Sequence, residues 1–237
     1  DFETLAGWGM QEVPHKRYLN DFFTGKIAES VSRGELYNED PITGDARFCA
    51  TTASMCGIES AGFEQNEEKK KRAVRFDLML HAYMMVQSGI PMLYSGDEIG
   101  QVNDYDYKKN LDTAADSRYL HRSPFRWDNA DKRKKAGTVQ YDIWNGLKQM
   151  EEIRRQDNCF GETAGISTWD TGNYAVFAIR RTAGNEELIC LANFSEYGQN
   201  AWLNCLEGEY EDLFTGEKLE MNSVWMNPYQ YRWCVKK

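Results

Sequence analysis

The chain has 237 residues, of which 41% are hydrophobic and 13% aromatic, and this composition excludes an intrinsically disordered protein. The formal net charge of -9 argues against a nucleic-acid partner, because phosphate binding requires a basic surface. The same charge is compatible with a neutral substrate such as a sugar, and equally with plain solubility.

The first predicted helix covers residues 14–23. Pro14 suits a first helical turn, and Tyr18, Phe22 and Phe23 gather on one face. Residues 24–62 follow, where glycine, small residues and charges alternate without a period. This pattern predicts a long, partly ordered insertion of the kind that carries substrate sites in barrel enzymes.

The second predicted helix starts after Asn66, which is a good N-cap, and extends to about Gln87. Its second half is apolar nearly all round, so we expect it to be buried. Gly89 and Pro91 end this helix, and the apolar residues 92–95 predict a strand directly behind it.

The predicted strand ends in Gly96-Asp97-Glu98. A (β/α)8 barrel presents such polar groups at the C-terminal ends of its buried strands, on the active-site face. The sequence before this strand is too short to hold the other strands of a barrel. We therefore expect the C-terminal part of a TIM barrel, whose earlier part lies outside the sequence.

A polar loop spans Gly96 to about Ala136, and a helix is predicted over residues 139–155. Beyond Gly161 short alternating runs recur at about ten-residue spacing, which is typical of an antiparallel β-sandwich. The strands are expected near residues 174–181, 188–194, 201–205, 210–213, 218–221 and 229–235, with a turn at 183–185 between the first two. The predicted fold class is thus α/β plus all-β. Residues 1–158 form the barrel part, with the insertion over about 1–65, and residues 159–237 form the sandwich.

The six cysteines show no Cys-x-x-Cys motif and no cluster with histidine, which argues against a zinc site. Most lie in apolar patterns, where thiols behave as small core residues. We expect free thiols and a reducing, cytoplasmic compartment, and a Cys190–Cys205 bridge remains an open alternative. The sequence has no run of about twenty apolar residues, the length that a membrane-spanning helix requires. The chain opens on Asp1-Phe2 without methionine, and no signal peptide is visible.

Asp97 and Glu98 look at first like the acid pair of a glycosidase. Neighbouring residues on a strand point to opposite faces, however, whereas a retaining pair flanks one bond with carboxyls about 5 Å apart. We therefore expect one of them to face the barrel and the other to hold the loop.

Two further groups are candidates for substrate binding. The loop after the predicted strand carries Asp104, Asp116 and Arg118, and an arginine fork can lock a carboxylate and close a pocket. In residues 40–47 a turn signal precedes Asp45 and Arg47. A surface ion pair between these two residues and a role in substrate binding are equally favoured. The histidines are scattered, and no phosphate loop, dinucleotide fingerprint or Ser/His/Asp signature is present.

The order of these motifs resembles the amylosucrase-like branch of the α-amylase superfamily, glycoside hydrolase family 13, over essentially the whole chain. The pattern G-x-P-x-x-Y-x-G-x-E of residues 89–98 resembles the last barrel strand of this superfamily. The other segments that carry the resemblance are Thr43-Gly44-Asp45-Ala46-Arg47, Thr51-Thr52-Ala53-Ser54, Asn103-Asp104, Asp116-Ser117-Arg118-Tyr119, His121-Arg122, Asn193-Phe194-Ser195-Glu196-Tyr197 and Pro228-Tyr229-Gln230 with Trp233.

The resemblance implies a retaining enzyme that cleaves or transfers α-glucosyl groups of sucrose or α-glucans, without metal or organic cofactor. It implies that Arg118 seals the glucosyl pocket with an upstream aspartate, and that Arg47 lines the acceptor side. Asp1 matches the tail of a His-Asp-Asp motif, or else the third catalytic carboxylate itself. The nucleophile and the acid would lie in the missing N-terminal part of the barrel, so the chain alone is expected to be inactive.

Two other readings remain. A non-catalytic carbohydrate-binding or structural module could stack sugars on Trp169, Trp202 or Trp225, although core packing of these residues is favoured. A complete enzyme of another fold would have to use Asp97 or Glu98.

Overall fold

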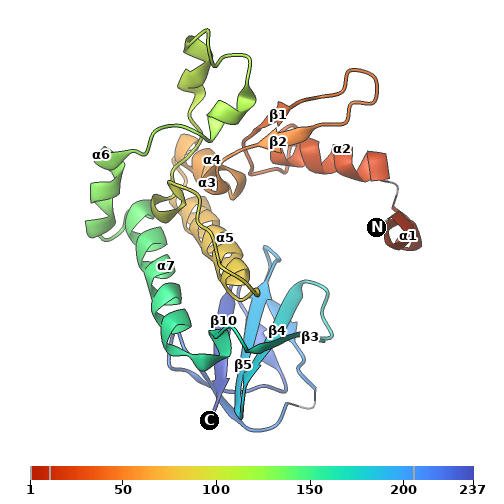
Figure 1. Cartoon of the computed structure of the whole chain (residues 1–237), viewed down its shortest axis with the longest axis vertical. Coiled ribbons are helices and arrows are strands. Elements are labelled where there is room, and N and C mark those ends of the chain that lie inside the picture. Colours follow the sequence, from red (N-terminus) through yellow and green to blue (C-terminus); the bar gives the residue numbers. More distant parts are fainter. Residues whose placement is uncertain (1, 11, 205) are drawn as a thin grey trace. The chain divides into compact units, whose positions relative to one another are not determined.

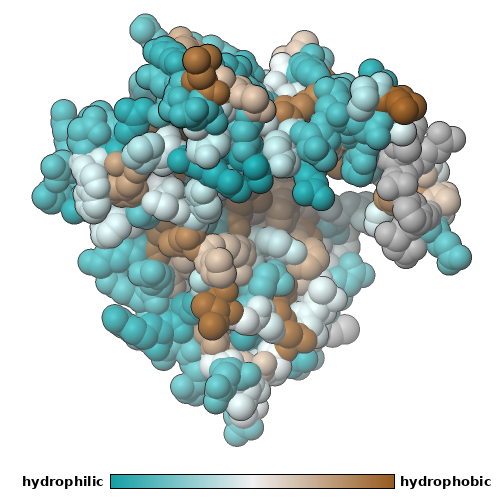
Figure 2. Space-filling view, turned by 45° about the horizontal axis from the view of Figure 1, so that its top comes forward, coloured by the Kyte–Doolittle hydropathy of each residue, from teal (hydrophilic) through white to brown (hydrophobic). Residues whose placement is uncertain are grey.

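The computed structural model describes residues 2–10, 12–204 and 206–237, and it divides into two compact units (Figure 1). The first unit comprises Asp1–Ala73 and Ser95–Asp131, and the second comprises Val74–Tyr94 and Lys132–Lys237. Hydrophilic side chains cover most of the face shown in Figure 2, where hydrophobic side chains form small separate groups.

The helix predicted over residues 14–23 is confirmed as α2 (Glu12–Phe23), and a short helix α1 (Phe2–Gly7) precedes it. The ring of Phe23 stacks on Phe48 with 4.7 Å between the ring centroids. The side-chain amide of Asn20 donates to the carbonyl of Ala46 at 2.9 Å. Helix α2 is therefore fastened to the segment around Phe48.

Residues 24–62 are more ordered than predicted. They form an antiparallel pair of three-residue strands and two short helices: β1 (Glu35–Tyr37), β2 (Arg47–Cys49), α3 (Thr52–Met55) and α4 (Ile58–Phe63). Strands of three residues are too short for an alternating pattern to stand out in the sequence. Thr51 lies between the hairpin and helix α3, and its hydroxyl caps α3 by accepting from the Ser54 N–H.

Helix α5 (Glu67–Met85) confirms the second predicted helix, and its C-terminal half is buried as expected, with Met79 and Met85 almost fully enclosed. The strand predicted at residues 92–95 is wrong. Residues 91–94 belong to no helix or strand, and a turn at 95–96 leads into η1 (Asp97–Ile99).

The missing strand has a physical cause. An isolated extended segment leaves its backbone donors and acceptors without a ladder, and none of the described strands pairs with this one. The side chains that a barrel would bury are exposed instead, with Ile90 at 91% and Met92 at 81%. The tract therefore presents an apolar surface to solvent.

The polar loop after this tract contains three 3-10 turns and one short helix: η2 (Tyr105–Lys109), η3 (Ser117–Leu120), α6 (Trp127–Ala130) and η4 (Asp131–Lys134). Helix α7 (Val139–Gln156) then confirms the helix predicted over residues 139–155. Thr138 caps it by accepting from the Tyr141 N–H, and Ile143, Leu147 and Met150 are buried. The turn η5 (Asn158–Phe160) follows.

The C-terminal strands are confirmed as short and antiparallel in every described pairing. A six-stranded sheet has the order β3-β4-β5-β10-β7-β8, and β6 and β9 form a separate two-stranded ribbon. Strands β3 and β9 were not predicted, and Cys205 lies outside the described residues. The bounds are β3 (Gly165–Trp169), β4 (Val176–Ala183), β5 (Glu186–Asn193), β6 (Gln199–Ala201), β7 (Glu209–Asp212), β8 (Lys218–Glu220), β9 (Val224–Met226) and β10 (Tyr231–Lys236).

Both faces of the sheet are covered within the second unit. The ribbon and one face share a hydrophobic core that includes Ala178, Leu191 and Met226. On the opposite face Tyr83 of α5 packs edge-on against Phe177, with 5.4 Å between the ring centroids. Helices and strands thus form one packed body here, and the predicted domain division at residue 158 stays a prediction.

Five cysteines are confirmed as free thiols, and all five are buried: Cys49, Cys56, Cys159, Cys190 and Cys234. The alternative Cys190–Cys205 bridge involves Cys205, which lies outside the described residues. Within the described chain, every helix is too short or too polar to cross a bilayer.

Gly146 of α7 offers a test of the helix packing in the second unit. A Cβ at this position would lie 2.6 Å from Cδ2 of Leu78 on α5. Gly146→Ala should therefore lower the free energy of unfolding by about 1–3 kcal/mol, although alanine is normally the better helix former. Urea unfolding followed by far-UV circular dichroism measures this change.

Gly62 of α4 is the matched control, because a Cβ there meets no atom within 4 Å. Gly62→Ala should leave stability unchanged or raise it by up to about 1 kcal/mol. Equal stability changes in both variants would contradict the proposed contact between α5 and α7.

Candidate substrate-binding site

The predicted binding residues lie in the first unit, on two segments that are distant in sequence. Asp104, Asp116 and Arg118 belong to the polar loop, whereas Asp45 and Arg47 belong to the hairpin and the segment before it. Asp1, the tentative catalytic residue, lies outside the described residues.

A buried amide joins the loop to the insertion. The Asn103 side chain donates to the carbonyl of Arg33 at 2.8 Å and accepts from the Thr51 N–H at 2.8 Å. Its backbone N–H donates to the Ser54 hydroxyl at 2.9 Å. Asn103 is only 7% exposed, so these bonds take the place of hydrogen bonds to water.

The Ser54 hydroxyl continues this network to Glu59, another buried residue, at 2.5 Å. The Tyr105 hydroxyl donates to the second carboxylate oxygen of Glu59 at 2.8 Å. Burial raises the pKa of Tyr105 to about 12, so its hydroxyl stays protonated and remains a donor. The start of η2 is thereby fixed against helices α3 and α4.

The other end of the loop is fastened to strand β1. The Ser117 hydroxyl donates to the carbonyl of Leu36 at 2.8 Å, and Lys108 pairs with Glu35 at 2.5 Å. Tyr107 also donates to Glu35. These contacts bring η3, and with it Arg118, onto the hairpin.

Arg118 and Asp116 form a bidentate ion pair. The arginine Nε lies 2.9 Å from Oδ1 and its Nη2 lies 2.7 Å from Oδ2 of the carboxylate. Oδ1 also accepts from the Arg118 N–H, which caps η3. The bonds from Arg118 lower the pKa of Asp116 to about 2. The resemblance assigns Arg118 an upstream aspartate instead, and that role stays a prediction.

Tyr37 connects Arg118 to Arg47. The Arg118 guanidinium carbon lies 4.8 Å from the centre of the Tyr37 ring, which is a cation–π contact. Tyr37 is directly opposite Arg47 in the β1–β2 register, so their side chains share one face of the hairpin. Tyr37 was not singled out from the sequence, because its neighbours follow only from the strand pairing.

The remaining two carboxylates have partners of their own. Asp104 caps η2 and lies 2.8 Å from Nη2 of Arg126. Asp45 lies 2.8 Å from Nζ of Lys16 on α2, so the local Asp45–Arg47 pair is not the one that forms. Arg47 itself is exposed.

Asp97 and Glu98 do not form an acid pair. Both belong to η1, and the Glu98 carboxylate accepts the Gly96 N–H at 2.8 Å. Glu98 thus holds the turn, as one of the two was predicted to do.

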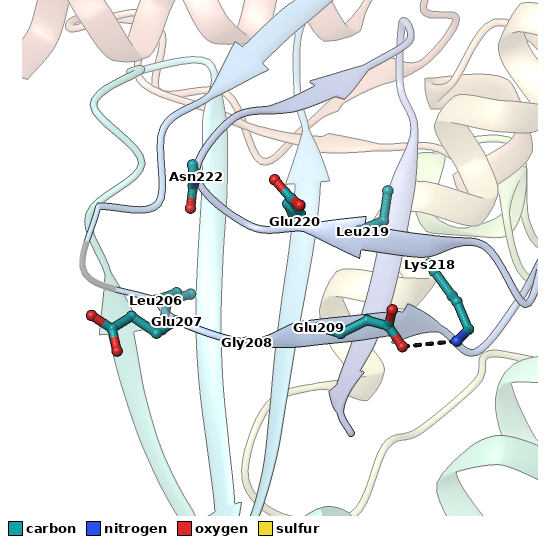
Figure 3. A pocket seen from close by; sticks show the side chains of 8 residues that line it. All are labelled: Leu206, Glu207, Gly208, Glu209, Lys218, Leu219, Glu220 and Asn222. Atoms are coloured by element: carbon teal, nitrogen blue, oxygen red, sulfur yellow. Dashed lines mark hydrogen bonds and ion pairs between the residues drawn. The ribbon is translucent and has the colours of Figure 1, made fainter.

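One group of described side chains has metal-ligating atoms close together, namely Asp157, Cys159 and Glu186 in the second unit. Burial raises the pKa of the Cys159 thiol to about 12. A hollow at strands β7 and β8 is lined by eight residues, three of which are glutamates: Glu207, Glu209 and Glu220 (Figure 3). Its single lysine, Lys218, pairs with Glu209 at 2.9 Å.

The geometry supports binding rather than bond cleavage. The Arg118 guanidinium lies against the Tyr37 ring, and Arg47 is opposite Tyr37 in the strand register, on the same face of the hairpin. Guanidinium groups donate hydrogen bonds, and a tyrosine hydroxyl donates and accepts them, which suits a polyhydroxylated ligand. It contains no pair of carboxylates across a reactive bond.

No family model matches the chain. Among curated proteins it is 26% identical over 167 residues to a glucosylglycerate phosphorylase of Escherichia coli strain K12, a match that covers 69% of this chain and 28% of the relative. It is 28% identical over 142 residues to a cyclomaltodextrinase of Thermoanaerobacter pseudethanolicus, covering 59% of this chain and 21% of the relative. The chain therefore spans less than a third of the length of these relatives.

Solved structures show the same fold at low identity. Isomaltulose synthase from Klebsiella sp. LX3 superposes with a TM-score of 0.56 and 19% identity, covering 69% of this chain and 38% of that one. The enzyme AmyP in complex with maltose gives a TM-score of 0.56 and 17% identity, covering 69% and 35%.

These relatives and neighbours are enzymes of the α-amylase family, glycoside hydrolase family 13, which confirms the resemblance at that level. The amylosucrase-like branch and the barrel-plus-sandwich arrangement stay predictions.

The ion pair of Arg118 has a testable effect on Asp116. Its pKa in the folded protein is below the ordinary 3.8, so the pair stabilises the fold above that value and loses its effect as the pH falls through about 2. Arg118→Ala should return the pKa of Asp116 towards 3.8, as measured by carboxyl carbon NMR.

Arg122→Ala serves as the control for this titration, because Arg122 acts on Asp116 only through a weaker charge interaction. Its effect on the Asp116 pKa should be smaller than that of Arg118→Ala. An Asp116 titration near its ordinary value in the unmodified chain would contradict the ion pair.

Asn103→Asp tests the buried amide. The substitution keeps the shape but replaces the donor to the Arg33 carbonyl by an acceptor, which should cost about 1–3 kcal/mol of stability. Hydrogen exchange of residues 103–120 should become faster. Asn110→Asp is the control, because the exposed Asn110 side chain only accepts, from the Asp112 N–H, and it should leave exchange unchanged.

Proposed function

We propose that this chain is the C-terminal part of a retaining α-glucoside hydrolase or transglucosylase of the amylosucrase-like branch, acting on sucrose or α-glucans in carbohydrate metabolism. The observation that carries the proposal is the contact of Arg118 with Tyr37, opposite Arg47. The two residues assigned to the glucosyl pocket and the acceptor side are far apart in sequence, yet one contacts Tyr37 and the other is its partner in the strand register.

The exposed apolar tract supports the same proposal. In the intact enzyme, residues 92–95 would form the last barrel strand, paired with parallel strands from the missing N-terminal part. Burial of Ile90 and Met92 against those neighbours would contribute roughly 1.5–3 kcal/mol for each side chain. The absence of a strand here is then a consequence of absent partners and not of the local sequence.

The chemistry follows the retaining mechanism, which needs a carboxylate nucleophile and a carboxylic acid about 5 Å apart. These groups are assigned to the upstream part, with Asp1 at or beside the third carboxylate. Arg118, Arg47, Asp45, Asp104 and Asp116 orient the sugar, and the chain alone does not turn over substrate. The reaction uses no metal or organic cofactor, and the free buried thiols suit a cytoplasmic location.

A second candidate function is a carbohydrate-binding module without catalysis. It is favoured by two tryptophans of the second unit, Trp202 and Trp225, which are exposed and not in the core as expected. Binding by this chain is compatible with either function, so turnover by the intact protein separates them.

The decisive experiment compares the intact protein with this chain on sucrose and maltooligosaccharides, with release of reducing sugar as the readout. Only the intact protein should turn over. In it, Arg118→Lys should lower kcat/KM by roughly a hundredfold, because lysine cannot reproduce a planar bidentate fork.

Arg155→Lys, at an exposed position of α7, is the matched control and should leave kcat/KM unchanged. Turnover by this chain alone would refute the proposal. If Asp97→Asn or Glu98→Gln then abolished that turnover, the chain would be a complete enzyme of another kind.

A further inference from the structure

The β6–β9 ribbon of the second unit has two different faces. Ala201, Val224 and Met226 are buried in the core that the ribbon shares with the sheet. Side chains alternate along a strand, so Asn200 and Trp225, which are directly opposite in register, lie on the outer face. Trp225 is 59% exposed.

Trp202 extends this outer face beyond the end of β6. It lies two residues after Asn200 and is 45% exposed. Its backbone N–H donates to the carbonyl of Thr171 at 2.8 Å, which fixes the chain after β6 to the loop before β4. Two large aromatic side chains are therefore presented by one small ribbon.

The Trp225 indole rests on a glycine. A Cβ at Gly198 would lie 2.3 Å from Cζ2 of Trp225, so this indole occupies the space that any other side chain would fill. The Gly198 backbone thus supports one side of the Trp225 ring, which is 59% exposed. Near Trp202, a Cβ at Gly172 would lie at 3.7 Å from Cε3, an ordinary van der Waals distance.

The polar groups between the rings are neutral. With the Asn200 amide oriented to satisfy all its neighbours, its oxygen accepts from Nε1 of Trp202 at 3.0 Å and from the Ser223 hydroxyl at 2.7 Å. Its nitrogen donates to the carbonyl of Val224 at 3.2 Å. The amide thus locks the Trp202 ring to the ribbon, and the Ser223 hydroxyl lies beside it.

We propose that the outer face of the β6–β9 ribbon binds a neutral glucose oligosaccharide, which stacks its sugar rings on Trp225 and Trp202. A pyranose ring has apolar C–H faces and a rim of hydroxyls, and a supported indole offers a flat apolar face of matching size. Fixed aromatic side chains bind at low entropic cost. The uncharged amide and hydroxyl suit a neutral ligand. The choice of glucose units rests on the proposed function.

The test uses the full chain and maltoheptaose. Indole NMR signals of Trp202 and Trp225 should shift on titration. The double variant Trp202→Ala/Trp225→Ala should raise the Kd at least about tenfold, since two aromatic platforms are lost. Trp144→Ala, at a partly exposed position on α7 in the same unit, should leave the Kd unchanged.

Two further variants guard against misfolding. Trp202→Phe/Trp225→Phe keeps aromatic faces and should retain part of the affinity, with an unchanged thermal midpoint. Gly198→Ala should weaken binding by pushing the Trp225 ring off its support.

An absence of indole shifts at saturating maltoheptaose would overturn the proposal, and so would an unchanged Kd in the double alanine variant. If the chain is a dimer, the double alanine variant is a monomer and sugar causes no indole shifts, this face is a self-association surface and the proposal is wrong. If the ribbon binds sugar but the intact protein shows no turnover, only the proposed function is contradicted. If the intact protein turns over substrate but the ribbon does not bind sugar, only this inference is contradicted.

Discussion

The buried side chain of Asn103 controls the arrangement of the first unit. Its amide satisfies one backbone donor at Thr51 and one backbone acceptor at Arg33. An amide can do both at once, because its oxygen accepts and its nitrogen donates. Since this residue immediately precedes Asp104 and η2, the position of the whole polar loop follows from it. Arg118 reaches Tyr37 only because the loop is held at this end and, through Ser117, at β1.

A different constraint shapes the second unit. The central strands of its sheet are covered on both faces, by the ribbon on one and by α5 on the other. In β5 nearly every residue is therefore buried, without the alternation of a half-exposed strand. The outer side of the ribbon, by contrast, is not covered in the described chain. This side presents aromatic side chains to solvent while the inner side completes the core.

The long helices could be predicted from the sequence because their signals are local. The cap at Asn66 and the apolar spacing within each helix require no knowledge of distant residues. Most of the C-terminal strands were located for the same reason, through alternation and turn residues, whereas β3 and β9 were not predicted. What could not be predicted was pairing. Tyr37 becomes relevant only when β1 is aligned with β2, and Asp45 pairs with Lys16 on a helix that its sequence neighbourhood does not reveal.

The two predicted binding segments have a defined structure, whereas the predicted barrel strand does not form. This difference follows from where their hydrogen-bond partners lie. The loop and the hairpin satisfy their polar groups from within the first unit, through Asn103, Ser117 and Glu35, so they hold a defined geometry on their own. The tract at residues 91–94 has apolar side chains suited to a buried strand, but a strand exists only with a neighbour to complete its ladder. In the proposed enzyme the loop and the hairpin therefore keep their geometry without the rest of the barrel, whereas the last strand forms only when the barrel does.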